Sequence, residues 1–293
     1  MQSLVYITLR LFVFFFTLLP FRVLYWISNG LQFLFFYVIK YRYSIIKSNL
    51  EKSFPRQSEQ NIQQLMWAFY QNLSDIFLEG IKGLSMSKME LIKRYRFVNP
   101  EVLENYYNQK QSIIILASHY GNWEWGARAI GYQIKHHTIG IAAPVKNQFV
   151  HDYLKSVRDS ENVTTVEMKQ TPRAFVQYKE QTAAFVFIMD QSPRNTRGAH
   201  WVNFLNQETA CLQGADYYAR RMNYPVFFAV QKRISRGYYE VELQLLERQS
   251  SQLPEEAITK RYMKKLEEIV LQKPENWLWS HRRWKHKTEN KTK

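Results

Sequence analysis

The chain has 293 residues, 46% of them hydrophobic, which suits one large α/β domain or two small ones with a sizeable core. Its formal net charge of +15 at pH 7 attracts polyanions, namely nucleic acid, an acidic carrier protein or anionic lipid headgroups, without choosing among them. A single cysteine, Cys211, excludes an internal disulfide framework and points to a reducing compartment.

The N-terminal region carries two apolar runs, residues 11–21 and residues 23–39, which are interrupted at Pro20 and Arg22. A helix needs about 20 apolar residues to span a bilayer, and the second run approaches that length. The first ten residues lack the early basic cluster of a secretory signal, and no small-residue cleavage site follows the apolar run. We therefore expect residues 1–45 to form an uncleaved membrane anchor.

Basic residues follow the apolar runs directly, at Lys40, Arg42 and Lys47. Positively charged flanks stay on the cytoplasmic side of a membrane, so residues 46–293 are expected on that side as a separate domain. The alternative is a hairpin of two buried helices within a soluble protein.

Further along the chain, residues 57–83 have apolar positions at helical spacing, and a second helical stretch precedes Pro100. Then the pattern changes to short apolar runs that are typical of strands buried on both faces, at 112–117, 138–143, 182–189 and 225–230. Residues 238–245 alternate like an edge strand. Helical patterns lie between these segments, near 122–133, 147–160, 172–180, 210–222 and 255–271.

This alternation of strands and helices predicts an α/β fold, with a mostly parallel central sheet flanked by helices. In such sheets, functional sites gather where the strands end at their carboxyl termini. We therefore expect functional residues in the segment that follows the first apolar strand.

That segment reads SHYGNWE, so His119 follows the strand and Glu124 falls in the first turn of the next helix. Gly121 and Asn122 supply a turn between them, and Asn122 also suits a helix N-cap. With such a turn, the carboxylate of Glu124 can reach the imidazole of His119. The alternative is that His119 and Glu124 form an ordinary polar pair at the rim of the sheet, without a catalytic role.

A histidine at this position suits a general base, because imidazole titrates near neutral pH and can take the proton of an alcohol. A carboxylate on the other ring nitrogen, here expected from Glu124, would fix the tautomer. The chain has no G-x-S-x-G elbow, so the nucleophile is expected to be the hydroxyl of the acceptor itself. No H-E-x-x-H or paired-cysteine spacing is present, so no metal site is expected.

The stretch ASHYGNWEW resembles the active-site motif of the bacterial lipid A biosynthesis acyltransferases, the late lauroyl and myristoyl transferases. That family is part of the wider group of glycerolipid acyltransferases with a His-x4-acid motif. Further blocks resemble the family in the same order along the chain: VKNQFVHDYLKSVR, FIMDQSP, WVNFLNQETACLQGADYYAR and PENWLWSHRRWK.

The resemblance implies that His119 is the base and Glu124 its partner. It places Arg158 near the active site, to steady an oxyanion or a donor phosphate, and Asp190 at its strand's end, where it helps to shape the site. Asn147 and Gln191 are further substrate-binding candidates.

The resemblance also implies a donor and an acceptor. The donor would be an acyl carrier protein thioester, with acyl-coenzyme A as the alternative, and the acceptor a hydroxyacyl chain of a lipid A precursor. It implies an enzyme without metal or redox cofactor at the inner membrane, with its catalytic domain on the cytoplasmic side.

Two alternatives remain open from the sequence. The same motif could acylate a lysophospholipid or an aminoacyl lipid. A basic membrane-peripheral or nucleic-acid-binding protein without catalysis would also explain the charge. However, the chain has no recognisable zinc-finger or ribonucleoprotein motif, and its basic residues are dispersed, so no nucleic acid partner is expected.

Overall fold

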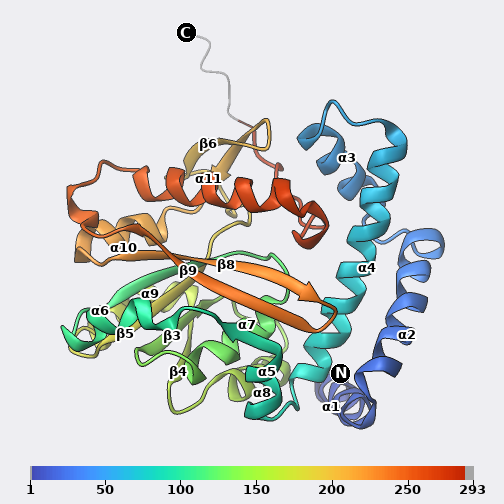
Figure 1. Cartoon of the computed structure of the whole chain (residues 1–293), viewed down its shortest axis with the longest axis horizontal. Helices are drawn as coiled ribbons and strands as arrows, with labels where there is room; N and C mark the ends of the chain where they lie inside the picture. Colours follow the sequence, from blue (N-terminus) through green and yellow to red (C-terminus); the bar gives the residue numbers. More distant parts are fainter. Residues whose placement is uncertain (1, 288–293) are drawn as a thin grey trace.

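The computed structural model describes residues 2–287. Within them, seven strands form the central sheet in the order β1-β9-β8-β2-β5-β3-β4 (Figure 1). The bounds are β1 Tyr95–Phe97, β2 Ile113–Ala117, β3 His137–Ala142, β4 Val163–Glu167, β5 Ala183–Ile188, β8 Val226–Ser235 and β9 Tyr238–Glu247.

All neighbouring strands of this sheet pair in parallel except β8 and β9, which form an antiparallel hairpin. The prediction of a mostly parallel α/β sheet is therefore confirmed. The prediction that residues 238–245 form an edge strand is wrong, because β1 pairs with the outer side of β9. Strand β1 spans only Tyr95–Phe97, which is too short for a recognisable pattern in the sequence.

Three helices cover one face of the sheet: α9 (Thr171–Gln177), α10 (Gly214–Met222) and α11 (Ala257–Gln272). Their apolar side chains share a core with β2, β5 and β8, in which the ring of Phe175 stacks on that of Phe185 at 3.9 Å. The helix expected over residues 210–222 begins later, because β6 (His200–Phe204) and β7 (Gln207–Cys211) form a separate antiparallel hairpin before it.

The opposite face is covered by α5 (Lys88–Arg94), α6 (Glu104–Asn108) and α7 (Trp123–Ala129). Here Ile113 and Ile115 of β2 pack with the fully buried Trp125 of α7. Helix α8 (Gln148–Arg158) lies further out and contacts α1, with the ring of Tyr6 against those of Phe149 and Tyr153.

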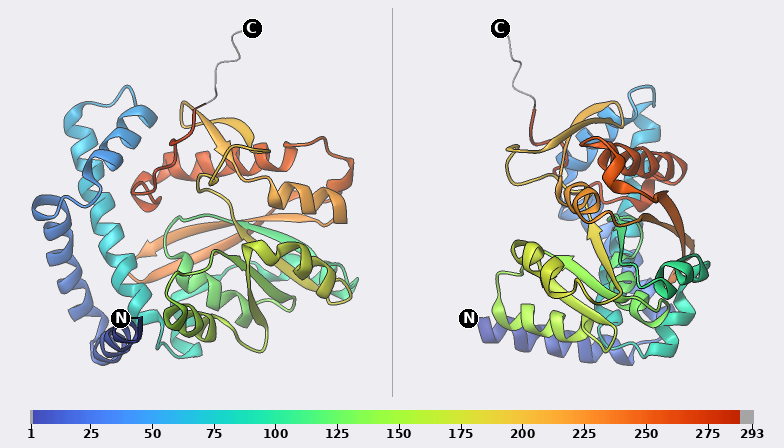
Figure 2. Two further views of the ribbon diagram at one scale, coloured as in Figure 1. Left: turned by 180° about the vertical axis from the view of Figure 1, so that it is seen from behind. Right: turned by 90° about the vertical axis from the view of Figure 1, so that its left-hand side faces the viewer.

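The N-terminal region is helical: α1 (Gln2–Leu18), α2 (Phe21–Phe33) with a π-helical turn over Leu34–Val38, α3 (Tyr43–Ser53) and the long α4 (Glu59–Gly83). Pro20 separates α1 from α2 and occupies the N-cap of α2. Figure 1 shows α4 running past the end of the sheet toward which β8 points, with α2 on its outer side, and Figure 2 shows the same arrangement from behind.

Among the described residues, no single helix combines the length and the apolar character needed to cross a bilayer. The segments Phe21–Val38 and Tyr43–Ser53 meet that requirement only when taken together, and they are bent by 88° relative to each other. The membrane anchor expected within residues 1–45 is therefore not confirmed.

Candidate active site

His119 and Asp190 emerge side by side from two adjacent parallel strands. The register pairs Ala117 of β2 with Ile188 of β5, and each side chain lies two residues beyond that pair. The Nδ1 atom of His119 is 2.7 Å from Oδ1 of Asp190, and the backbone N–H of His119 donates to Oδ2 at 2.9 Å. Strand order thus brings together two residues that are 71 positions apart.

The carboxylate of Asp190 is buried and has a third partner, the indole N–H of Trp277, which donates to Oδ2 at 2.8 Å. Burial alone would raise the pKa of Asp190, but the charge of His119 and the hydrogen bonds from His119 and Trp277 together hold this pKa below its ordinary value. An ionised carboxylate can only accept hydrogen bonds. The ring must therefore carry its proton on Nδ1, and Asp190 fixes this tautomer. The Nε2 lone pair of His119 is then left for chemistry, and the side-chain amide of Gln191 lies 3.2 Å from it.

Glu124 has a different partner from the one expected. Arg158, the last residue of α8, donates from Nη2 to both carboxylate oxygens of Glu124, at 3.0 and 2.7 Å. Both ring nitrogens of His119 have other partners. The expectation that Glu124 orients the ring of His119 is therefore wrong in this structure, where Asp190 occupies that position. The physical reason is that the first turn of α7 directs Glu124 toward α8 rather than toward the carboxyl end of β5.

A cavity of ≈ 820 Å³ opens beside this group and runs along the α7 face of the sheet. Its lining includes the polar side chains of His119, Glu124, Arg158 and Gln191. Many of the other lining residues are aliphatic and come from several strands and α7, among them Ile115, Ala117, Ile130, Gly140, Val186 and Ala229. A base in the wall of a large cavity with much aliphatic lining suits a reaction at the head of a hydrocarbon chain.

Residues 2–286 match the model of the bacterial lipid A biosynthesis acyltransferase family. The chain belongs to this family. It is similar to the lipid A biosynthesis lauroyltransferase of Escherichia coli (strain K12), with 24% identity over 276 residues, covering 92% of this chain and 88% of that protein. It is also similar to the palmitoleoyltransferase of the same strain, with 21% identity over 268 residues, covering 91% and 86%. A lipid A biosynthesis acyltransferase of Haemophilus influenzae shares 24% identity over 280 residues, covering 94% and 88%.

The turn between His119 and α7 has the geometry that this acyltransferase motif suggested. Gly121 has φ +62°, and a Cβ there would lie 2.0 Å from the side-chain nitrogen of Gln231. Only glycine fits both the left-handed backbone and this close approach. The side chain of Asn122 accepts a hydrogen bond from the backbone N–H of Trp125 at 3.0 Å, so the predicted N-cap is confirmed.

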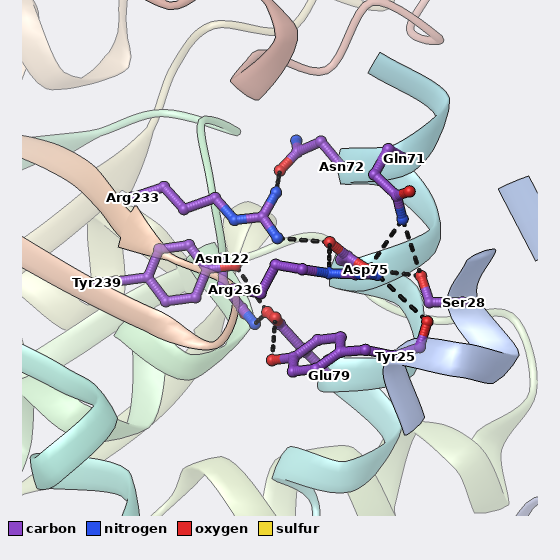
Figure 3. A network of polar contacts seen from close by, with 10 residues as sticks. All are labelled: Tyr25, Ser28, Gln71, Asn72, Asp75, Glu79, Asn122, Arg233, Arg236 and Tyr239. Carbon is purple, nitrogen blue, oxygen red and sulfur yellow. Dashed lines mark hydrogen bonds and ion pairs between the residues drawn. The ribbon is translucent and has the colours of Figure 1, made fainter. Parts of the chain in front are cut away.

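Behind this turn lies a buried carboxylate that the sequence did not reveal. Glu79 of α4 accepts hydrogen bonds from Asn122 Nδ2 at 2.8 Å, from the Tyr239 hydroxyl at 2.7 Å and from the Tyr25 hydroxyl at 2.9 Å (Figure 3). Its backbone carbonyl accepts from the indole of Trp125 at 2.9 Å. Burial raises the pKa of Glu79. This side chain holds the cap of α7, and therefore the position of the turn that carries His119.

The same network continues along α4. Asp75 is fully buried, forms ion pairs with Arg233 and Arg236, and accepts a hydrogen bond from the hydroxyl of Ser28 in α2 (Figure 3). Arg233 also donates to the side-chain oxygen of Asn72 at 2.8 Å. Polar side chains buried beside α4 thus join the N-terminal helix α2 to the end of the sheet where the site lies.

Replacing Glu79 by alanine should lower the free energy of unfolding by about 3–5 kcal/mol, because three donors, two of them buried, would lose their acceptor. Thermal or denaturant unfolding of the purified protein measures this. Tyr239→Phe removes only one of the donors and should cost about 1 kcal/mol. Equal stabilities of the Glu79→Ala variant and the wild-type protein would contradict the proposed role of the network.

The remaining predicted site residues divide between the cavity and its surroundings. Asn147 caps α8, its side chain accepting from the backbone N–H of Val150 at 3.2 Å, and it is not among the residues that line the cavity. Its connection to the site therefore runs through α8, which ends at Arg158. Cys211, which was not among the predicted site residues, is buried, and burial raises the pKa of its thiol, which does not suit a nucleophile.

Two tryptophans, Trp123 and Trp277, contact His119 and Asp190. The sequence motif around His119 did not predict these contacts. Trp123 places its ring 5.0 Å from the imidazole of His119 in an edge-on arrangement. Trp277 orients Asp190, and it lies in the block PENWLWSHRRWK, which already carried the family resemblance. The neighbouring backbone helps as well, since the N–H of Leu278 donates to the carbonyl of His119 at 3.1 Å.

Proposed function

We propose that this acyltransferase moves a fatty acyl chain from an acyl carrier protein thioester to a hydroxyl group of a lipid A precursor. The main support is the His119–Asp190 pair, whose histidine lines a cavity of ≈ 820 Å³ that also has many aliphatic lining residues. That arrangement provides a base where the head of a buried acyl chain would lie.

In the proposed reaction, the acyl chain lies in the cavity with its thioester carbonyl beside His119. The acceptor hydroxyl displaces the amide of Gln191 from Nε2 and gives its proton to that nitrogen as its oxygen attacks the carbonyl carbon. The tetrahedral intermediate collapses with cleavage of the carbon–sulfur bond, and the imidazolium returns the proton to the leaving thiolate. Asp190 stabilises the positive charge that His119 carries in between.

Arg158 and Glu124 act together in this proposal. Arg158 lines the cavity near the base and can stabilise the oxyanion or a phosphate of the donor, as the resemblance implied. Glu124 binds that guanidinium through both carboxylate oxygens and so keeps it in place. Its catalytic role is then to position Arg158, and Gln191 contributes a hydrogen bond near the reacting atoms.

The choice of substrates rests on the relatives and on charge. The relatives are named for lauroyl and palmitoleoyl transfer in lipid A biosynthesis. Besides Arg158, the cavity lining includes three more basic residues, Lys169, Arg194 and Arg197, and the chain has a net charge of +15. Such a surface attracts an acidic carrier protein whose prosthetic group bears a phosphate, and it attracts acyl-coenzyme A as well.

The proposal includes the cytoplasmic face of the inner membrane as the place of reaction. Large apolar side chains of α1 and α2 are exposed, including Leu11, Phe14, Trp26 and Phe33. Exposed apolar residues beside basic ones suit helices that lie at a membrane surface.

Incubation of the purified protein with a radiolabelled acyl thioester tests the function directly. A lipid A precursor, a lysophospholipid and an aminoacyl lipid would be offered separately, each with the carrier-protein and the coenzyme A donor. Transfer to the lipid A precursor from the carrier-protein donor is expected. Transfer to another acceptor alone would replace this function with the corresponding one, and no transfer at all would reject it.

The cavity predicts a change in chain-length preference at Gly140 of β3. This residue lines the cavity, and a Cβ placed on it meets nothing within 4 Å. Gly140→Leu should shorten the preferred donor chain by about two to four carbon atoms, because each methylene that loses its place in the cavity loses about 0.8 kcal/mol of burial. Competition between donors of different length measures the preference. Gly140→Ala, the matched control, should change it little, and an unchanged profile in Gly140→Leu would show that the acyl chain lies elsewhere.

A further inference from the structure

A second cavity, of ≈ 490 Å³, lies between α1, α4 and α8. We call it the helical groove. Aliphatic and aromatic side chains form much of its wall, among them Leu9 of α1, Ile76 and Phe77 of α4, and Val150 and Leu154 of α8.

The helical groove and the cavity beside the sheet meet at the candidate active site. Four residues line both of them: Trp123, Glu124, Arg158 and Gln191. Gln191 is the residue whose amide lies 3.2 Å from Nε2 of His119. Two separate, largely apolar spaces therefore converge next to the atom that would take the proton.

We propose that the helical groove binds an apolar chain of the lipid acceptor, while the cavity beside the sheet binds the acyl chain of the donor. This inference rests on the acyl transfer proposed above and assigns the two substrates to separate sites. A direct transfer joins two lipid-bearing molecules at one base, so each chain needs its own apolar path to that base. The convergence of the two spaces beside His119 provides those paths.

The surroundings of the helical groove suit a substrate that arrives from a lipid surface. Phe77 lines the groove and is 54% exposed, so apolar lining continues to the protein surface. On α1, the exposed side chain of Phe12, three residues after Leu9 and on the same side of the helix, extends the apolar surface beyond Leu9. A lipid can enter along such a path while its chain stays largely out of water.

The charge of the groove suits an anionic headgroup. Arg42 lines it, its Nη1 donates to the carbonyl of Ser280 at 2.9 Å, and within residues 2–287 no ion pair with a carboxylate is found for it. The other guanidinium of the lining, Arg158, is neutralised by Glu124. His281 adds no charge at neutral pH, because burial and nearby cations lower its pKa to about 4. Arg42 is therefore available to a phosphate group of the acceptor.

Gly80 offers a way to fill the helical groove while leaving the cavity beside the sheet unchanged. It lines the groove on the same stripe of α4 as Ile76, Phe77 and Leu84, and a Cβ placed on it meets nothing within 4 Å. A larger side chain there can extend into the groove. Removing a glycine from within a helix also favours the helix, because glycine loses more backbone freedom on folding than other residues do, so the variant should fold.

The experiment compares Gly80→Phe with Gly140→Leu in steady-state kinetics with both substrates varied. In Gly80→Phe, the KM for the lipid acceptor should rise at least about tenfold, while the KM for the donor and its chain-length preference stay within about twofold. Gly140→Leu should show the reverse pattern. Phe77→Glu, at an exposed position that folding tolerates, should also raise the acceptor KM, because its carboxylate repels an anionic lipid.

The outcomes separate the two proposals. Suppose that the wild-type protein transfers acyl groups, but Gly80→Phe and Phe77→Glu change only the KM for the donor or its chain-length preference. The groove then holds the donor chain, and this inference is overturned. It is also overturned if thermal melting shows that both variants are folded and both keep the wild-type KM for the acceptor. That result would mean that the groove binds a lipid that is not a substrate. Absence of transfer by the wild-type protein rejects the proposed function instead.

Discussion

His119→Ala should lower the rate of acyl transfer by about 10²–10⁴-fold, because the acceptor hydroxyl would lose the base that takes its proton. The imidazole is partly exposed and lines the cavity, and among the buried charged groups only the carboxylate of Asp190 loses a partner. The KM for the donor should change little, since the apolar wall of the cavity stays intact. Initial rates with a labelled thioester and saturating acceptor measure the effect.

Two controls distinguish loss of the catalytic step from loss of folding or of donor binding. Thermal melting shows whether His119→Ala remains folded, and an acyl-chain binding assay shows whether the cavity still accepts the donor. Retention of more than about a tenth of the wild-type rate, with the chemical step rate-limiting, would mean that another group is the base.

Asp190→Asn should lower the turnover number by about 10³–10⁴-fold with little effect on either KM. The carboxamide has the same shape, and its oxygen can still accept from the backbone of His119 and the indole of Trp277. Its NH₂ group would then donate to Nδ1 of His119. That hydrogen bond forces the ring proton onto Nε2, which can no longer act as a base.

Glu124→Gln is the matched comparison, because the two carboxylates contact different basic side chains. Glu124 holds Arg158, and this pair is partly exposed, with side-chain exposures of 38% and 21%. We expect a smaller loss, of about tenfold, exerted through the position of Arg158. The reverse order, with a severe loss in Glu124→Gln and a mild one in Asp190→Asn, would mean that Glu124 orients the base during turnover.

Much of the sheet could be predicted because its central strands are buried on both faces. Strands β2, β3, β5 and β8 were anticipated as continuous apolar runs, which such burial requires. Two strands without such a run were not predicted. Strand β1 is short, and β4 reads VTTVE at the edge of the sheet. Without β1, the alternation of β9 looked like that of an edge strand, although β9 has a partner on each side.

The candidate site shows the same division. The place of His119 after a buried strand, the glycine turn and the cap at Asn122 all follow from local rules, and the structure agrees with each. Asp190 could be selected as a charge at the end of a strand, but its contact with His119 could not be predicted. That contact depends on β5 being the neighbour of β2, and β3 and β4 come between them in the sequence.

The sequence by itself determined the α/β class, the position of the histidine and the family, because hydrophobic periodicity, turn residues and ordered motif blocks are properties of short stretches of chain. Only the tertiary structure decided which carboxylate binds His119, what Glu124 and Glu79 hold in place, and where two cavities meet. Those features arise from strand order and helix packing, which bring together side chains from distant parts of the chain, and no local pattern specifies such pairings.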